Sequence, residues 1–76
     1  MIEIYNRETG QLYRYDPMSH RIFRDGFFVP PQTATPVYSG TNDGQPSFAG
    51  IYLPEINSIL TLTGNVKEVT PIDKIH

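Results

Sequence analysis

The residues that could do chemistry gather in the first third of the chain, where arginines alternate with aromatic side chains. All four arginines lie within the first 24 residues. Together with the neighbouring rings they form the candidate contact set Tyr13, Arg14, Tyr15, Arg21, Phe23 and Arg24. Such side chains make up the hot spots of protein interfaces. They also form the stacking platforms that bind single-stranded nucleic acid.

The charge of this region separates these interpretations. Residues 1–26 hold four basic and four acidic side chains, and the whole chain has a net charge of −2. A nucleic-acid groove is normally positive. Ion pairs across a solvated sheet face are therefore the simplest account of the arginines, a protein contact comes second, and an RNA or single-stranded DNA contact third. A further alternative is an anionic, nucleotide-like small molecule, held between subunits by an aromatic cleft and an arginine.

Other chemical motifs are sparse. His20 lies in a polar turn with Asp16, which makes a two-ligand fragment without a third ligand nearby in the sequence. The chain has no cysteine nucleophile and no Gly-x-Ser-x-Gly elbow. The segment 41–44 lacks the alternating acidic ligands of a calcium loop, so we expect a plain turn there. We therefore expect a protein that is not an enzyme and that uses no metal or cofactor.

The size of the chain predicts self-association. A chain of 76 residues buries only about 60% of its unfolded surface, and its stability is correspondingly marginal. Because cysteine is absent, neither a disulfide nor a cysteine-ligated zinc can stabilise the fold. We expect a homo-oligomer or a protein partner to supply the missing stability, as in a small accessory, inhibitory or phage-like assembly protein. The lack of long apolar runs and of a basic leader favours a cytoplasmic protein with no membrane span.

The pattern of short alternating segments predicts one all-β domain over residues 1–76. Seven prolines and six glycines punctuate the chain. Strands are expected at 1–5, 11–15, 21–24, 27–29, 48–53, 58–63 and 67–72. Asp25-Gly26 predicts a type I′ hairpin turn. The polar segment 30–47 is expected to be a mobile loop, with at most a short edge strand at 37–38. The fold class is a small, hairpin-rich antiparallel sandwich or partly open barrel of about six or seven strands.

Two further patterns concern the core. The alternation predicts one aliphatic face, with Ile2, Ile4, Leu12 and Ile22, and one aromatic face, with Tyr5, Tyr13, Tyr15, Phe23 and Phe28. The aromatic face is expected either to be covered by the later strands or to form an interface. Residues 4–15 also match residues 51–62 in a faint repeat, which either a duplication or two hairpins of similar loop length would explain.

Overall fold

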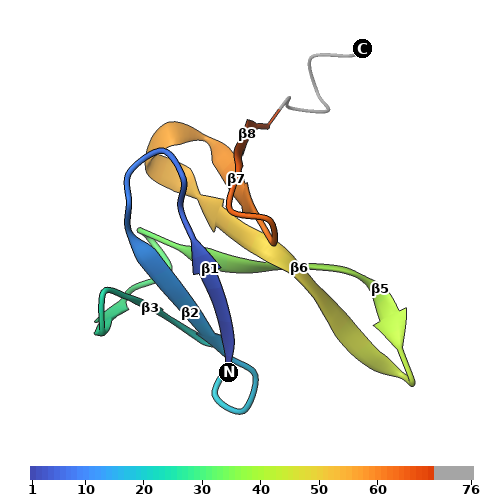
Figure 1. Ribbon diagram of the computed structural model, residues 1–76. Coiled ribbons are helices and arrows are strands. Elements are labelled where there is room, and N and C mark those ends of the chain that lie inside the picture. The colour runs from blue at the N-terminus through green and yellow to red at the C-terminus, as the bar shows by residue number, and fades with distance from the viewer. Residues whose placement is uncertain (70–76) are drawn as a thin grey trace.

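The computed structural model describes residues 1–69, whose elements are β-strands and one 3-10 turn (Figure 1). The elements are β1 (Ile2–Tyr5), β2 (Leu12–Asp16), β3 (Arg21–Arg24), β4 (Phe27–Val29), β5 (Thr35–Asn42), β6 (Gln45–Leu53), the 3-10 turn η1 (Pro54–Ile56), β7 (Ser58–Thr61) and β8 (Val66–Glu68). The end of the expected strand 67–72 lies outside the described residues. Residues 1–69 therefore hold eight strands, against the six or seven expected for the whole chain.

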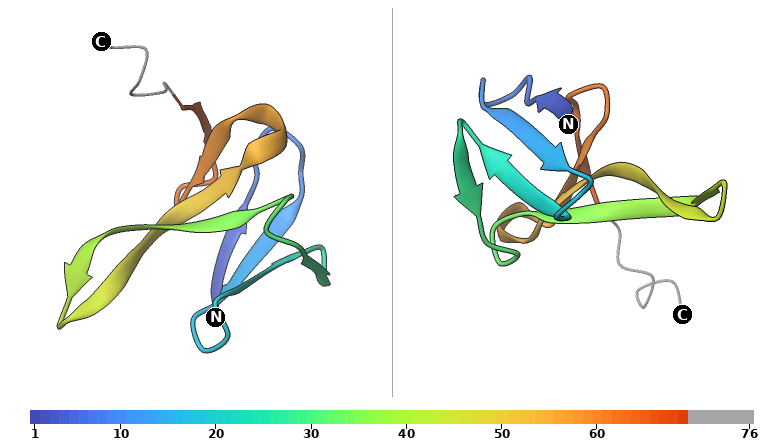
Figure 2. Two further views of the ribbon diagram at one scale, coloured as in Figure 1. Left: turned by 180° about the vertical axis from the view of Figure 1, so that it is seen from behind. Right: turned by 90° about the horizontal axis from the view of Figure 1, so that it is seen from below.

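These strands form two antiparallel sheets, which confirms the predicted fold class. Sheet A has the order β1-β2-β3-β4 and sheet B has the order β5-β6-β7-β8, so within each sheet every strand pairs with its neighbour in sequence. The inner faces of the two sheets share one core of nine buried residues, which are Ile4, Tyr13, Tyr15, Ile22, Val29, Ala34, Ile51, Leu53 and Leu60. The result is a small sandwich of two meanders (Figure 2).

The segment 30–47, expected to be a loop, is mostly strand. It contains β5 and the beginning of β6, which pair around Asp43-Gly44 with φ values of 53° and 78°. Positive φ at both central residues of a two-residue connection is a type I′ turn, and Asp25-Gly26 forms the same turn as predicted, with φ of 51° and 88°. Every residue from Tyr38 to Pro46 is exposed, so turn chemistry and strand pairing, without burial, define this hairpin. We call residues 39–47 the arm, and Figure 1 shows it projecting from the body.

The predicted division of the faces is wrong for β2. Ile4 lies opposite Tyr13 and Ile2 lies opposite Tyr15, so both tyrosines point inward and Leu12 points outward. The cause is the connection between β1 and β2, which has an even number of residues, from Asn6 to Gln11. With an even number of turn residues, each even-numbered residue of β1 lies opposite an odd-numbered residue of β2. A difference of one residue in this register would exchange the two faces of β2.

The repeat corresponds to equivalent hairpins. Ile51 lies opposite Leu60 in β6 and β7, as Ile4 lies opposite Tyr13 in β1 and β2. All four residues are at most 2% exposed. The matching turn positions, Gly10 and Asn57, both have positive φ, at 78° and 49°. The two hairpins thus supply equivalent halves of the core.

The sheets are joined at a corner between the β1–β2 turn and the β7–β8 turn. The backbone N–H of Arg7 donates to the Gly64 carbonyl at 2.9 Å, and its Nε donates to the Thr63 carbonyl at 3.2 Å. Gly64 is buried with φ of 88°, and a Cβ there would lie 2.2 Å from the Tyr5 carbonyl oxygen. This corner therefore requires a residue without a side chain.

Candidate interaction surface

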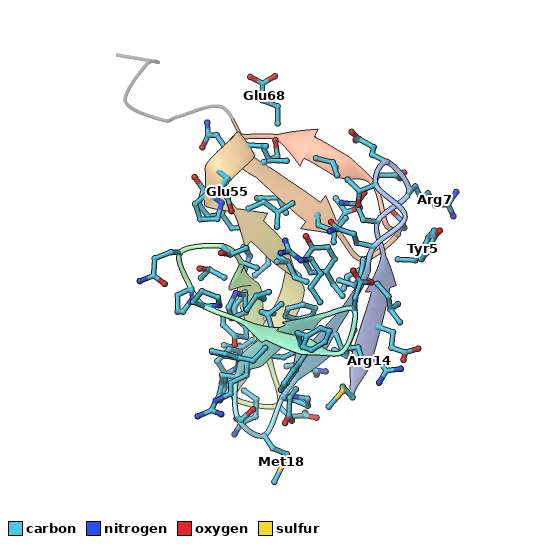
Figure 3. The ribbon with its side chains drawn as sticks, turned by 90° about the vertical axis from the view of Figure 1, so that its left-hand side faces the viewer. Tyr5, Arg7, Arg14, Met18, Glu55 and Glu68 are labelled. Carbon is cyan, nitrogen blue, oxygen red and sulfur yellow. The ribbon has the colours of Figure 1, made fainter. Side chains whose placement is uncertain are left out.

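The outer face of sheet A carries a row of side chains that crosses all four strands. The register places Glu3 opposite Arg14, Arg14 opposite Phe23, and Phe23 opposite Phe28. Glu3 and Arg14 form an ion pair at 2.8 Å, with both side chains about half exposed. Figure 3 shows Arg14 pointing outward from this side of the molecule. The row therefore offers both charge signs beside two rings.

The two rings form an aromatic pair that an arginine covers. Phe23 and Phe28 meet edge to face, with centroids 6.2 Å apart and an interplanar angle of 69°. The guanidinium of Arg21 lies 5.5 Å from the centroid of Phe28, within cation–π range. Met1, 68% exposed, lines a shallow hollow with Arg14 and Phe23. We call Met1, Arg14, Arg21, Phe23 and Phe28 the outer patch.

The six residues of the predicted contact set are divided between the two faces. Arg14, Arg21 and Phe23 lie together in the outer patch. Tyr13 and Tyr15 are each 2% exposed and belong to the core, so in this fold the later strands cover their rings and they are not part of the outer patch. Arg24 is paired with Tyr13, on the inner side of sheet A, and lines a cavity there. The change of face in β2 explains the places of Tyr13 and Tyr15, whereas Arg24 lies on the inner side because it alternates with Phe23 along β3.

Sequence reasoning missed two members of the outer patch as contact residues. Phe28 belongs there because the two-residue turn at 25–26 places it opposite Phe23. That turn was itself predicted, so counting across it would have found the pair. Met1 joins the outer patch through its long flexible side chain, which no spacing rule predicts.

A second cluster joins the base of the arm to sheet A. The rings of Tyr15 and Phe48 are stacked, with centroids 4.1 Å apart and an interplanar angle of 3°. The Tyr15 hydroxyl is hydrogen-bonded to the Tyr38 hydroxyl, and the Nδ1 atom of His20 lies 3.1 Å and 2.9 Å from these two oxygens. These contacts hold the arm, since Tyr38 is in β5 and Phe48 is in β6.

Burial governs the chemistry of the Tyr15 phenol. Burial, followed by the hydrogen bond with Tyr38, raises the pKa of Tyr15 from 10.0 to about 12. The phenol is therefore protonated at neutral pH and acts as a hydrogen-bonding group. An open groove of about 410 Å³ runs between this cluster and the arm, past Pro17 and Pro46.

The turn after β2 positions His20. One carboxylate oxygen of Asp16 accepts from the Met18 backbone N–H at 2.9 Å, and the other accepts from the Ser19 hydroxyl at 3.1 Å. The Met18 bond is the main cause that lowers the pKa of Asp16. His20 closes the turn at φ of 59° and donates its own backbone N–H to the Asp16 carbonyl. The Asp16–His20 pair thus shapes a turn.

Comparisons with protein-family models, curated proteins and solved structures find no match for this chain. Within residues 1–69, no three His, Asp or Glu side chains gather closely enough to hold a metal ion. The same stretch contains no helix of the length and apolarity needed to cross a membrane. A function for this chain is therefore inferred from its own surfaces.

Proposed function

We propose that this chain is a non-catalytic protein-binding module that self-associates through the outer patch. The observation that carries the proposal is the Phe23–Phe28 pair beneath Arg21, on a sheet face that no other element of residues 1–69 covers. Phe28 is 52% exposed. Aromatic and arginine side chains are enriched at protein interfaces, and burying such rings against a partner is favourable.

The charges of this face favour a second copy as the partner. Arg14 and Arg21 lie beside Glu3 and Asp16, so the face is neutral and carries both signs. A twofold axis brings the same face of two copies together, and each arginine can then approach a carboxylate of the other copy. A strongly basic or acidic face would repel its own copy.

Short strands limit the strength of this association. Sheet A has strands of three to five residues. Stable complexes bury roughly 800 Å² per partner, and four strands of this length offer only a small face. We therefore expect a concentration-dependent dimer with a Kd on the order of micromolar, unless the arm adds contact area.

Molar mass measured by light scattering from about 1 μM to about 1 mM tests the proposal. Phe28→Ser should weaken the dimer about tenfold or more, as truncation of an aromatic hot spot does. Leu62→Ser is the matched control, because Leu62 is 51% exposed and lies in the β7–β8 turn, outside sheet A. A chain that stays monomeric throughout, or an equal effect of both substitutions, would exclude the outer patch as a self-association surface.

The same surface makes single-stranded nucleic acid the second candidate, because an arginine stacked on an exposed ring also binds bases. Titration with a single-stranded oligonucleotide decides between the two. Binding that falls steeply with salt and that Phe28→Ser removes would favour nucleic acid. We expect no such binding, because the neutral face offers no excess of positive charge.

A further inference from the structure

A donor-lined cavity opens between the turns of the two equivalent hairpins. Its volume is about 180 Å³, several times the space of one water molecule. The β1–β2 turn contributes Asn6 and Gln11, sheet A contributes Tyr13 and Arg24, and η1 with its preceding residue forms the opposite wall. This cavity lies on the inner side of sheet A, away from the outer patch.

Two polar side chains that line this cavity, those of Asn6 and Tyr13, are almost fully buried. Each has one polar atom without a hydrogen-bond partner within residues 1–69. Asn6 is 2% exposed, and its Oδ1 accepts from the backbone N–H groups of Glu8 and Thr9 at 2.9 Å and 3.3 Å. Because these groups only donate, the amide orientation is determined and Nδ2 points the other way. Neither Asn6 Nδ2 nor the hydroxyl of Tyr13 has a hydrogen-bond partner within residues 1–69. No partnerless polar atom in this part of the chain is fully enclosed, so both atoms keep some accessible surface, and both residues line the cavity.

Arg24 adds the positive charge. Its side chain is half-buried at the cavity wall. Its guanidinium makes no ion pair or hydrogen bond with residues 1–69, where Arg14 forms the ion pair with Glu3. Arginine presents a planar set of N–H donors that matches the two oxygens of a carboxylate. Together with the amide of Asn6 and the phenol of Tyr13, it forms a site that mainly donates hydrogen bonds.

We infer that this cavity binds a small organic carboxylate with a short apolar tail. The donors select an anion, since each can hydrogen-bond a carboxylate oxygen. Glu55 also lines the cavity and offsets the charge of Arg24, so a second negative charge, as on phosphate, gains no net attraction there. Leu53 and Ile56 supply an apolar wall for the tail, and a ligand with a branched end fits them better than a bare ion.

Two-dimensional NMR titration of the full chain tests this site with three probes: 4-methylpentanoate, its neutral amide 4-methylpentanamide, and inorganic phosphate. The carboxylate should move the side-chain amide signals of Asn6 and Gln11 in a saturable way. It should bind at least about tenfold more tightly than the amide, because a hydrogen bond to a charged group contributes more than one to a neutral group. Equal binding of acid and amide, stronger binding of phosphate, or unmoved amide signals would overturn the proposal.

Matched substitutions locate the contact. Tyr13→Phe keeps the buried ring and removes only the hydroxyl, and it should weaken carboxylate binding about tenfold. Arg24→Met removes the charge while keeping a similar apolar stem, and it should weaken binding more. Arg21→Met removes an arginine of the outer patch and should leave carboxylate binding unchanged, so this site and the proposed dimer can fail independently. Full binding by Tyr13→Phe and Arg24→Met would exclude the cavity, with circular dichroism confirming that each variant is folded.

Discussion

Replacing Gly64 by alanine should destabilise the protein far more than replacing Gly26, although both residues have φ of 88°. Both substitutions force an L-residue into the left-handed region. They differ in their surroundings: a Cβ on Gly26 meets nothing within 4 Å, whereas a Cβ on Gly64 would lie 2.2 Å from the Tyr5 carbonyl oxygen. The pair therefore isolates the steric requirement of the corner that joins the two sheets.

The expected magnitudes follow from this contrast. The left-handed conformation costs about 1–2 kcal/mol for a residue with a side chain, and both variants share this cost. At Gly64 the Cβ must move by about 1 Å to reach an ordinary contact distance. That movement disrupts the hydrogen bonds from Arg7 to Gly64 and Thr63, which adds about 2–3 kcal/mol. We expect losses of about 1–2 kcal/mol for Gly26→Ala and about 3–5 kcal/mol for Gly64→Ala.

Urea unfolding followed by tyrosine fluorescence and far-ultraviolet circular dichroism measures both losses. A domain of this size has a total stability on the order of 4–11 kcal/mol. With an m-value of about 1 kcal/mol/M, the urea midpoints of the two variants should differ by about 2 M. If the losses agree within about 0.5 kcal/mol, the close approach of Gly64 to Tyr5 does not exist in solution and the proposed packing of the corner is wrong.

Three further perturbations probe other contacts. The pKa of Tyr15 is raised to about 12, so the neutral phenol stabilises the fold below pH 10. This contribution to stability is lost as the pH rises from 10 to 12. In the Tyr15→Phe variant, urea midpoints measured across the same pH range should not show this loss. Glu3→Gln breaks a half-exposed ion pair, so its cost should stay below about 1 kcal/mol and shrink in high salt. Asn6→Ala leaves the backbone N–H groups of two turn residues without their acceptor and should cost about 1–3 kcal/mol in the same unfolding assay.

Local signals predicted much of this fold. The Asp25-Gly26 dipeptide correctly predicted its turn, and alternation correctly predicted the all-β fold class outside the segment 30–47. The match between residues 4–15 and 51–62 corresponds to two hairpins with the same register. These features depend on residues close in sequence, where turn chemistry and strand period act directly.

The errors came from information that is not local. Which face of β2 points inward depends on whether the β1–β2 connection has an even or an odd number of residues. The alternation of residues within a strand gives no information on this number. That single error placed Tyr13 and Tyr15 on a surface. The arm was predicted as a loop because its composition is polar, although Asp43-Gly44 repeats the Asp-Gly signal recognised at 25–26. The donor-lined cavity brings Asn6 and Arg24 toward η1, which begins 48 residues after Asn6 and 30 residues after Arg24.

The strict neighbour-to-neighbour pairing of the strands has a consequence for how the molecule assembles. Contacts that are close in sequence form quickly, so this fold should reach its native state faster than sandwiches with crossed connections. The chain can also be divided in the linker at 30–34 without separating any paired strands. Each fragment would contain all four strands of one sheet but lack the other sheet that covers its apolar side, and mixing the two should restore the parent circular dichroism spectrum. The protein is therefore suited to use as a split reporter, whose halves regain structure only when they meet.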